Sequence, residues 1–120
     1  MTHPILHIVN FMECEVLDVH KIKRWFMESA EIAKAKVLHK AFHVFPNGAI
    51  TGVLILSESH MAIHTWPEYK NCQIDIFSCG EKMQPMAAIS YLEYRLKPKT
   101  FRYVPFERPV DETTANPVTV

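Results

Sequence analysis

Short apolar runs separated by turn residues dominate the pattern of hydrophobic and polar positions along this chain. In the stretch from residue 60 to His64 and in residues 72–79, apolar and polar side chains alternate with a period of two, which is typical of strands with one covered face. The run from Ile5 to Met12 is apolar with polar interruptions at His7 and Asn10. We therefore predict strands over residues 5–12, 37–45, 49–56, 60–65, 72–79 and 100–106.

Two segments show the helical period instead. Between residues 16 and 35, apolar positions recur every three or four residues while charged ones fall elsewhere, as expected of a helix with one buried face. Asp18 is suited to cap this helix, because its carboxylate can accept a hydrogen bond from a backbone N–H of the first turn. A second helix is predicted from about Gln84 to Leu96, with Pro85 in its first turn.

The residues between these elements mark where the chain turns. Pro46-Asn47-Gly48 has turn chemistry, and residues 57–59 are expected to connect two strands tightly. The strand over 49–56 is apolar on both faces in its second half, which predicts a central strand covered on both sides. Gly52 interrupts it and indicates close approach by another backbone or a ligand. Residues 107–120 are rich in Pro, Asp, Glu, Thr and Asn, so we expect a flexible tail.

This order of elements predicts an α+β fold. We expect an antiparallel β-sheet covered by two helices, a two-layer sandwich, built as a single domain over residues 1–120. Two helices leave the other face of the sheet uncovered, and a second copy of the chain would cover it. The sequence thus predicts a homodimer with active sites close to its interface.

Composition narrows the classes of function. The 120 residues include 13 basic and 13 acidic side chains, which gives no charge surplus for binding nucleic acid or an anionic membrane. No apolar run approaches the length of a membrane span, and the first residues lack the features of a signal peptide. The three cysteines form no CxxC pair, so we expect no disulfide scaffold and a location in the reducing cytoplasm.

Residues 54–69 carry the densest set of reactive side chains. His60 and His64 are four apart on one predicted strand and could share a metal ion, but no third ligand stands at a familiar spacing. Cys79 and His64 could form the pair of a thiol hydrolase, although nothing marks an oxyanion hole. A polar turn flanked by two ordinary histidines is the third possibility. We expect no metal, and the residue types alone leave the other two readings open.

Two runs within residues 57–80 form one long motif. They read Ser57-Glu58-Ser59-His60-Met61-Ala62-Ile63-His64-Thr65-Trp66-Pro67-Glu68-Tyr69 and Ile74-Asp75-Ile76-Phe77-Ser78-Cys79-Gly80. This motif resembles the prokaryotic S-adenosylmethionine decarboxylases, which are small, self-cleaving, pyruvoyl-dependent enzymes of polyamine biosynthesis. The likeness is close over about residues 51–80 and looser over 5–106. It implies decarboxylation of S-adenosylmethionine, with a pyruvoyl group as cofactor, to supply aminopropyl groups for spermidine.

The resemblance implies autocatalytic cleavage between Glu58 and Ser59. The Ser59 hydroxyl would attack the Glu58 carbonyl, and elimination would leave a pyruvoyl group at the new amino terminus. His64 matches the base that removes the Ser59 α-proton, a task suited to a side chain that titrates near neutral pH. Thr51 stands where the family usually has a serine that assists this step, and it keeps the hydroxyl.

For turnover, the resemblance implies a Schiff base between the pyruvoyl carbonyl and the substrate amine, which accepts electrons as carbon dioxide leaves. Cys79 matches the proton donor of that reaction. Because nothing in the cleavage chemistry requires a thiol, Cys79→Ala is expected still to cleave but to turn over slowly. Glu68 matches the carboxylate that holds the ribose hydroxyls, and Phe45 matches the ring that stacks on adenine.

Departures from the family pattern keep alternatives open. The usual Gly-x-His before the first strand is replaced by Pro4-Ile5-Leu6, and Asn10 stands where relatives carry an acid near the substrate. A relative that decarboxylates arginine or ornithine with the same pyruvoyl chemistry is therefore an alternative. A relative that folds without processing and acts as a regulatory subunit is another.

Overall fold

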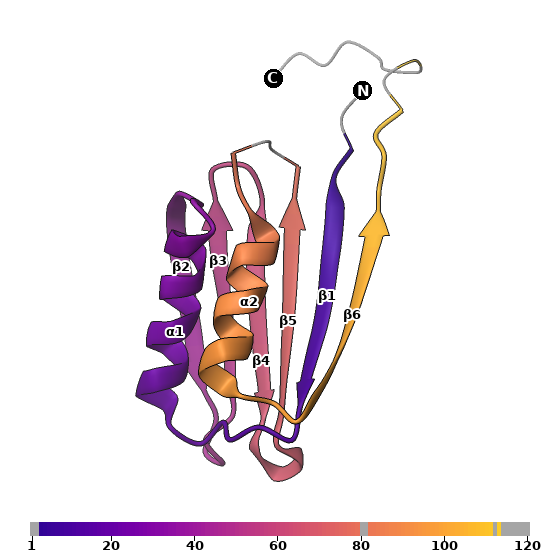
Figure 1. Ribbon diagram of the computed structural model, residues 1–120. Helices are drawn as coiled ribbons and strands as arrows, with labels where there is room; N and C mark the ends of the chain where they lie inside the picture. The colour runs from indigo at the N-terminus through magenta and orange to yellow at the C-terminus, as the bar shows by residue number, and fades with distance from the viewer. Residues whose placement is uncertain (1–2, 80–81, 112, 114–120) are drawn as a thin grey trace.

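The computed structural model describes residues 3–79, 82–111 and 113. These form an antiparallel sheet of six strands with two helices on one face (Figure 1). The arrangement confirms the predicted α+β class and its two layers. The elements in chain order are β1 (Ile5–Met12), α1 (Val19–Ile32), β2 (Val37–Val44), β3 (Ile50–Leu56), β4 (His60–Trp66), the 3-10 turn η1 (Pro67–Tyr69), β5 (Asn71–Ser78), α2 (Pro85–Leu96) and β6 (Thr100–Glu107).

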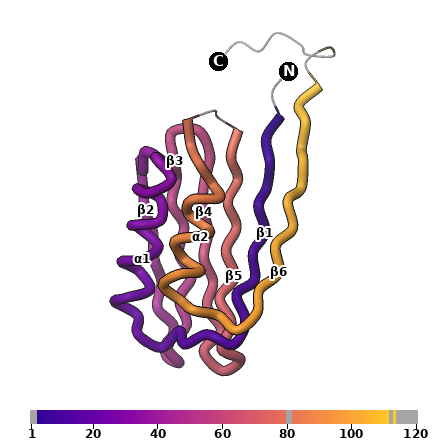
Figure 2. Tube along the Cα trace, viewed as in Figure 1, coloured from indigo at the N-terminus to yellow at the C-terminus, as the bar shows by residue number. Residues whose placement is uncertain are grey.

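The strands lie in the order β2-β3-β4-β5-β1-β6, and all neighbours are antiparallel. Strands β2 to β5 follow one another along the chain, whereas β1 and β6 come from its two ends and pair side by side (Figure 2). The β3–β4 turn and the ends of β5 and β6 therefore meet at one end of the sheet. We call this the turn end, defined by residues 57–59. The opposite end, defined by η1, is called the corner end.

Helix α1 begins where Asp18 caps it. The Asp18 carboxylate accepts a hydrogen bond from the Lys21 N–H at 3.1 Å, which confirms the predicted cap. The helix ends at Ile32, and Lys34 follows with a φ of 60°, because the chain must turn there to enter β2. The predicted span over 16–35 was therefore too long at both ends. Of the helices in the described part of the chain, neither is long and apolar enough to cross a membrane.

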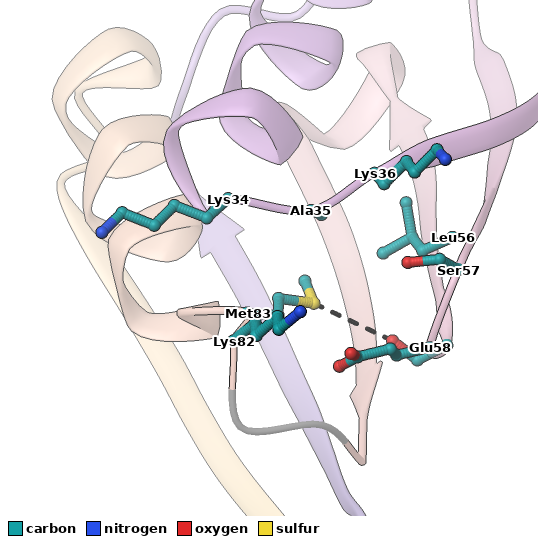
Figure 3. Close-up of a pocket in the computed structure, with 9 residues that line it drawn as sticks. Lys34, Ala35, Lys36, Leu56, Ser57, Glu58, Lys82 and Met83 are labelled. Carbon is teal, nitrogen blue, oxygen red and sulfur yellow. Dashed lines mark hydrogen bonds between the residues drawn. The ribbon is translucent and has the colours of Figure 1, made fainter.

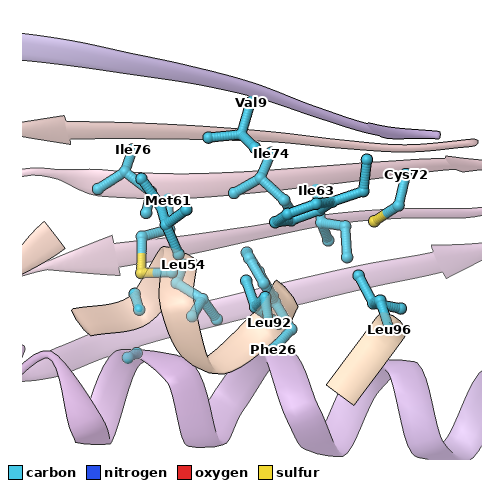
Figure 4. Close-up of a cluster of buried hydrophobic side chains, with 14 of the residues drawn as sticks. Val9, Phe26, Leu54, Met61, Ile63, Cys72, Ile74, Ile76, Leu92 and Leu96 are labelled. Carbon is cyan, nitrogen blue, oxygen red and sulfur yellow. The ribbon is translucent and has the colours of Figure 1, made fainter. Parts of the chain in front are cut away.

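The hydrophobic core lies between the sheet and the two helices (Figure 4). Phe26 of α1 and Leu92 of α2 are almost completely buried there, and they face alternate residues of the strands, such as Ile74 and Ile76 of β5. Burial of a side chain of this size contributes roughly 1.5–3 kcal/mol, so this layer holds the sheet firmly against the helices. Further buried strand residues are Val9, Phe11, Ile50, Leu54, Met61 and Ile63.

Gly52 of β3 makes room for an aromatic ring. The Phe42 side chain of β2 lies across it, and a Cβ at position 52 would come within 2.5 Å of that ring. Phe42 packs in turn edge-on against Phe26, with ring centroids 6.2 Å apart. The close approach predicted for this glycine is confirmed, but the neighbour is a side chain of the same sheet rather than a backbone or a ligand.

The face of the sheet away from α1 and α2, here called the open face, carries exposed apolar side chains. In β3, Val53 is 38% exposed and Ile55 is 49% exposed. The predicted cover on both sides of β3 is not provided by this chain itself, because both helices lie on the other face (Figure 1). The open face also exposes Trp66, Val104 and Phe106.

The carboxyl-terminal segment is more ordered at its start than predicted. Glu107 belongs to β6, and the Arg108 N–H donates a hydrogen bond to the Pro4 carbonyl at 2.8 Å. The pairing with the first strand therefore extends into the expected tail. Residue 112 and residues 114–120 of that tail lie outside the described residues.

Candidate active site

Residues 57–59 form the tight connection between β3 and β4, as predicted. The Leu56 N–H donates to the Ser59 carbonyl at 2.9 Å and closes the turn, and the Ser57 N–H donates to the Lys36 carbonyl at 3.0 Å. The peptide bond between Glu58 and Ser59 is therefore anchored on both sides. This is the bond at which the sequence predicts cleavage.

Cys79 lies beside this turn because β5 runs next to β4. Phe77 pairs with His60 in the register of the two strands, which brings the residue after β5 against the residues before β4. The Cys79 thiol donates a hydrogen bond to the Glu58 carbonyl oxygen, with an Sγ–O distance of 2.6 Å. That oxygen would take negative charge if Ser59 attacked the carbonyl carbon, so the thiol is placed to stabilise it.

The Ser59 side chain contacts the residue that leads into helix α2. Its hydroxyl donates a hydrogen bond to the Met83 sulfur at 3.8 Å (Figure 3). A thioether is a weak acceptor that takes no proton at neutral pH, so Met83 orients the hydroxyl without activating it. A cavity of about 190 Å³ surrounds this contact and is lined by Lys34, Ala35, Lys36, Leu56, Ser57, Glu58, Ser59, Lys82 and Met83.

His64 lies on β4, toward the corner end of the open face. The Thr51 hydroxyl of β3 makes a hydrogen bond with His64 Nδ1 at 2.8 Å, in agreement with the pairing of the two residues in the sheet. Trp66 and Phe45 contact the imidazole, with ring centroids 4.4 Å and 6.3 Å away. A hydroxyl on Nδ1 orients the ring and leaves Nε2 for proton transfer.

Phe45 and Glu68 join His64 around a second cavity, of about 450 Å³. Asn47 Nδ2 donates a hydrogen bond to one Glu68 carboxylate oxygen at 3.2 Å, which leaves the other oxygen for hydroxyl donors. Phe45 is 39% exposed and offers a ring face to a flat group. The predicted substrate-binding residues and the predicted base thus line one cavity. Its remaining lining residues are Pro46, Asn47, Ala49 and Trp66.

The predicted site residues fall into two groups at opposite ends of the sheet. His60, which follows the turn, and His64 are four strand residues apart, or about 13 Å at the usual rise per residue. Within one chain His64 therefore does not reach Ser59 or Cys79, and no thiol hydrolase pair forms. The turn-end group comprises Glu58, Ser59 and Cys79, and the corner-end group comprises Phe45, Thr51, His64 and Glu68.

The two histidines of β4 do not form a metal site in the chain as folded. His60 stacks on Phe77, with ring centroids 5.4 Å apart and planes 18° from parallel, while His64 is engaged by Thr51. Among the residues that the structure describes, no cluster of three or more His, Cys, Asp or Glu side chains could hold a metal ion.

The three thiols differ in their surroundings. All are free, and Cys79 is exposed whereas Cys14 and Cys72 are buried. Burial raises the pKa of the Cys14 thiol to about 11, and burial also raises the pKa of the Cys72 thiol. Both buried thiols stay protonated at neutral pH, which leaves Cys79 as the thiol accessible from the open face.

Two side chains at these sites were not assigned from the sequence. Trp66 contacts the predicted base, and its position inside the motif was the signal for it. Met83 lies outside the motif, 24 residues after Ser59, and no sequence pattern connects the two. Their contact arises because the chain returns past the turn end to begin α2.

Comparison with known proteins identifies the family. Residues 5–109 match the family model described as S-adenosylmethionine decarboxylase. The chain belongs to this family. The S-adenosylmethionine decarboxylase proenzyme of Thermotoga petrophila is 40% identical over 104 residues, which cover 84% of this chain and 80% of that protein. The proenzyme of the same name from Acetivibrio thermocellus is 44% identical over 91 residues, which cover 76% of this chain and 73% of that protein.

A solved structure has the same fold as this family member. The crystal structure of the adenosylmethionine decarboxylase from Aquifex aeolicus matches it with a TM-score of 0.84, over 97% of this chain and 98% of that one. The two sequences are 24% identical, so this likeness concerns the fold alone. The family resemblance inferred from residues 51–80 is confirmed by the sequence comparisons.

Proposed function

We propose that this chain is a pyruvoyl-dependent S-adenosylmethionine decarboxylase that cleaves itself between Glu58 and Ser59. Family membership supports the reaction, and the name proenzyme of relatives about 40% identical fits self-cleavage. The observation that carries the proposal is the hydrogen bond from the Cys79 thiol to the Glu58 carbonyl oxygen. It places a donor on the atom where negative charge develops during cleavage.

Cleavage begins with an acyl shift at the anchored turn. The Ser59 Oγ bonds to the Glu58 carbonyl carbon, the bond from that carbon to the Ser59 nitrogen breaks, and the hydroxyl proton ends on this nitrogen. The Cys79 S–H stabilises the oxygen anion formed on the way, while Met83 orients the attacking hydroxyl. The product is an ester between Glu58 and the Ser59 side chain.

The ester breaks by elimination, for which a base removes the Ser59 α-proton. The bond from the Ser59 Cβ to the ester oxygen breaks, and the backbone carbonyl of Glu58 leaves as a terminal α-carboxylate. The enamine that remains takes up water and loses ammonia, which produces the pyruvoyl group. His64 fits the role of base, because an imidazole nitrogen can accept a proton and the Thr51 hydroxyl orients this ring.

The residues at both ends of the sheet suit the second reaction. The pyruvoyl group would supply an electron sink for the loss of carbon dioxide from an amino acid. Cys79 returns a proton to the carbon that has lost carbon dioxide, Phe45 stacks on adenine, and Glu68 accepts hydrogen bonds from the ribose hydroxyls. The product would supply aminopropyl groups for spermidine. Free thiols fit a reducing cytoplasm as the place of this work.

The separation of the turn-end and corner-end groups supports a homodimer of cleaved protomers in which both copies build each site. A two-fold axis through the open face would bring the turn end of one copy against the corner end of the other. The partner's His64 would then reach Ser59, and the substrate would bridge the two groups. The same contact would bury exposed apolar side chains such as Val53, Ile55 and Phe106.

The corner-end cavity favours S-adenosylmethionine over arginine or ornithine. It holds about 450 Å³ and combines an aromatic face with a carboxylate, which suits an adenine ring and a ribose. Arginine and ornithine have neither group and would leave Phe45 and Glu68 without a partner. Asn10 does not line this cavity, and its sheet partner Gln73 accepts a hydrogen bond from the lining residue Trp66 at 3.1 Å.

Intact mass and carbon dioxide release together test this function. Purified wild-type protein should consist of the fragments 1–58 and 59–120, the second without a free amino group, whereas Ser59→Ala should stay whole. Carbon dioxide should be released from S-adenosylmethionine and not from arginine or ornithine. Light scattering should give the mass of a dimer. Uncleaved wild-type protein after long incubation contradicts the proposed processing, and a monomer at micromolar concentration contradicts the shared site.

A further inference from the structure

Arg108 lies directly after β6 and is tied to the sheet at its turn end. Its N–H donates a hydrogen bond to the Pro4 carbonyl at 2.8 Å, which extends the pairing of β6 with β1 beyond Glu107. Its guanidinium lies over the Phe77 ring of β5, 5.3 Å from the ring centroid. Because β1 lies between β6 and β5, the side chain reaches across the open face.

Phe77 connects Arg108 with the turn-end group. The ring stacks on His60, the first residue of β4 after the turn. Cys79 follows Phe77 by two residues and shares its face, since Ser78 between them is buried on the helix side. Two strand residues span about 7 Å, so the guanidinium and the Cys79 thiol border the same small area of the open face.

The chemistry of decarboxylation determines where the substrate carboxylate must lie. The bond from the α-carbon to the carboxylate breaks, carbon dioxide leaves, and the same carbon takes a proton. The carboxylate and the proton donor Cys79 are therefore both neighbours of one carbon atom. At the turn end of the open face, among the described residues of β4, β5, β1 and β6 and the residue after β6, Arg108 carries the one permanent positive charge.

We propose that the Arg108 guanidinium binds the α-carboxylate of the amino-acid substrate, beside Cys79. This inference rests on the proposed function and adds a substrate contact to it. A guanidinium offers two parallel N–H donors to a carboxylate, and its contact with the Phe77 ring holds it in place. The site takes a charged α-amino carboxylate and binds its uncharged ester or amide more weakly.

This contact acts on binding more than on the chemical step. As carbon dioxide forms, negative charge leaves the carboxylate, so the guanidinium stabilises the transition state no better than the bound substrate. Its loss should raise the KM and change kcat little. The decarboxylated product has no carboxylate, so its affinity should not depend on Arg108.

Arg108→Gln tests the proposal, with Arg95→Gln as the matched control. Arg95 also lies over an aromatic ring, 5.6 Å from the Tyr94 centroid, but it belongs to α2 on the other side of the sheet. Both variants should cleave themselves like wild type. Arg108→Gln should raise the KM for S-adenosylmethionine by about 10- to 100-fold, the range for a hydrogen-bonded charge pair. Inhibition by the decarboxylated product should not change, and Arg108→Lys should recover part of the loss.

Several outcomes overturn the carboxylate site. An unchanged KM in Arg108→Gln does so, and so does an equal loss of affinity for substrate and product. Slower self-cleavage in this variant would indicate that the guanidinium binds the Glu58 side-chain carboxylate before cleavage instead of the substrate. A wild-type enzyme that releases no carbon dioxide overturns the proposed function together with this contact. An active wild type with Arg108→Gln indistinguishable from Arg95→Gln overturns the contact alone.

Discussion

The two faces of one sheet use their polar side chains in different ways. On the helix-covered face, His7 Nδ1 bonds to the Tyr103 hydroxyl at 2.7 Å, and no buried side-chain N or O atom of the described residues lacks a partner. On the open face, Cys79 is exposed and the Thr51–His64 pair is partly exposed. Polar groups complete the packing on the covered face, and the open face presents them to a substrate.

The proposed chemistry is also divided along the sheet, between its turn end and its corner end. The turn-end group contains the proposed nucleophile and proton donor, whereas the corner-end group contains the proposed base and the proposed substrate cavity. The strand between them keeps Ser59 and His64 more than about 13 Å apart. If both groups act on one substrate, as proposed, one chain holds two halves of a site that it cannot close on itself, which is the physical reason to expect a second copy.

Separating the nucleophile and the base onto different chains gives the strongest test of this division. Ser59→Ala and His64→Ala should each stay uncleaved when expressed alone. When they are expressed together, a mixed dimer places Ser59 of the His64→Ala chain against the intact base of the Ser59→Ala chain. Cleavage of the His64→Ala chain should then go from none to readily detected by intact mass, since this is the chain that still has the nucleophile.

The control for this experiment is a partner that lacks both groups. His64→Ala expressed with the double variant Ser59→Ala/His64→Ala should remain whole, because no copy supplies a base. Cleavage of His64→Ala alone would place the base within its own chain or on another residue. If confirmed mixed dimers are not cleaved, the proposal that both copies build each site is wrong.

The next comparison is between the buried thiol of Cys72 in β5 and the exposed thiol of Cys79, the residue directly after β5. Cys79→Ala should lower turnover by about 10²- to 10⁴-fold, the usual loss for a general acid. Its hydrogen bond to the Glu58 carbonyl changes the expectation from the sequence, and self-cleavage should also slow, by about tenfold, since a thiol is a weak donor. Cys72→Ala, on the covered face, should cost about 1 kcal/mol of stability and leave both rates unchanged.

Time courses on gels and carbon dioxide release measure these two rates separately. Near-normal turnover in Cys79→Ala would move the proton donor to another residue. Normal cleavage with slow turnover would keep the donor role and remove the role in cleavage.

Much of the fold could be predicted because the signals for its elements are local. The alternating residues 72–79 predicted a strand that the structure contains as β5, and the carboxylate of Asp18 caps α1 as expected. The pattern was less informative for β3. Apolar residues such as Val53 and Ile55 indicate that a face needs cover, but a sequence does not say whether a helix of the same chain or a second copy provides it.

The candidate site was predicted less completely than the fold. The motif located its residues, but Ser59 and His64 are five positions apart and look like neighbours until a strand extends the interval along the sheet. Met83 and Arg108 lie outside the motif. Met83 lies in the segment that leads into α2, and Arg108 directly follows β6. Both segments come near the turn only when the whole sheet has formed.

Substitutions in the corner-end cavity should have a smaller effect, on binding. Phe45→Ala and Glu68→Gln should each raise the KM for S-adenosylmethionine by about tenfold, because base stacking and charge-assisted hydrogen bonds each contribute about 1–3 kcal/mol. Self-cleavage should stay normal, since neither residue touches the turn. Tyr94→Ala, which is 67% exposed on α2, is the control and should leave the KM unchanged. A fall in kcat with an unchanged KM would assign these residues to the chemical step.

The smallest expected effect comes from the covered face and concerns pH. Burial lowers the pKa of His7 from its usual value of about 6.5, so the unfolded chain takes up a proton at a higher pH than the folded chain does. The stability that depends on neutral His7 is complete above that value and decreases as the pH falls through it. One such group changes the free energy of unfolding by at most about 1.4 kcal/mol per pH unit.

His7→Gln keeps an acceptor for the Tyr103 hydroxyl but does not titrate. The free energy of unfolding by urea should therefore depend less on pH between about pH 7 and 5 than it does in wild type. Exposed His20→Gln should follow the wild-type curve, and groups common to all three proteins cancel in the comparison. If His7→Gln also follows it, the covered face does not hold His7 neutral. If His7→Gln changes the pH profile of turnover and not that of stability, His7 takes part in the chemistry and does not serve only the packing of the covered face.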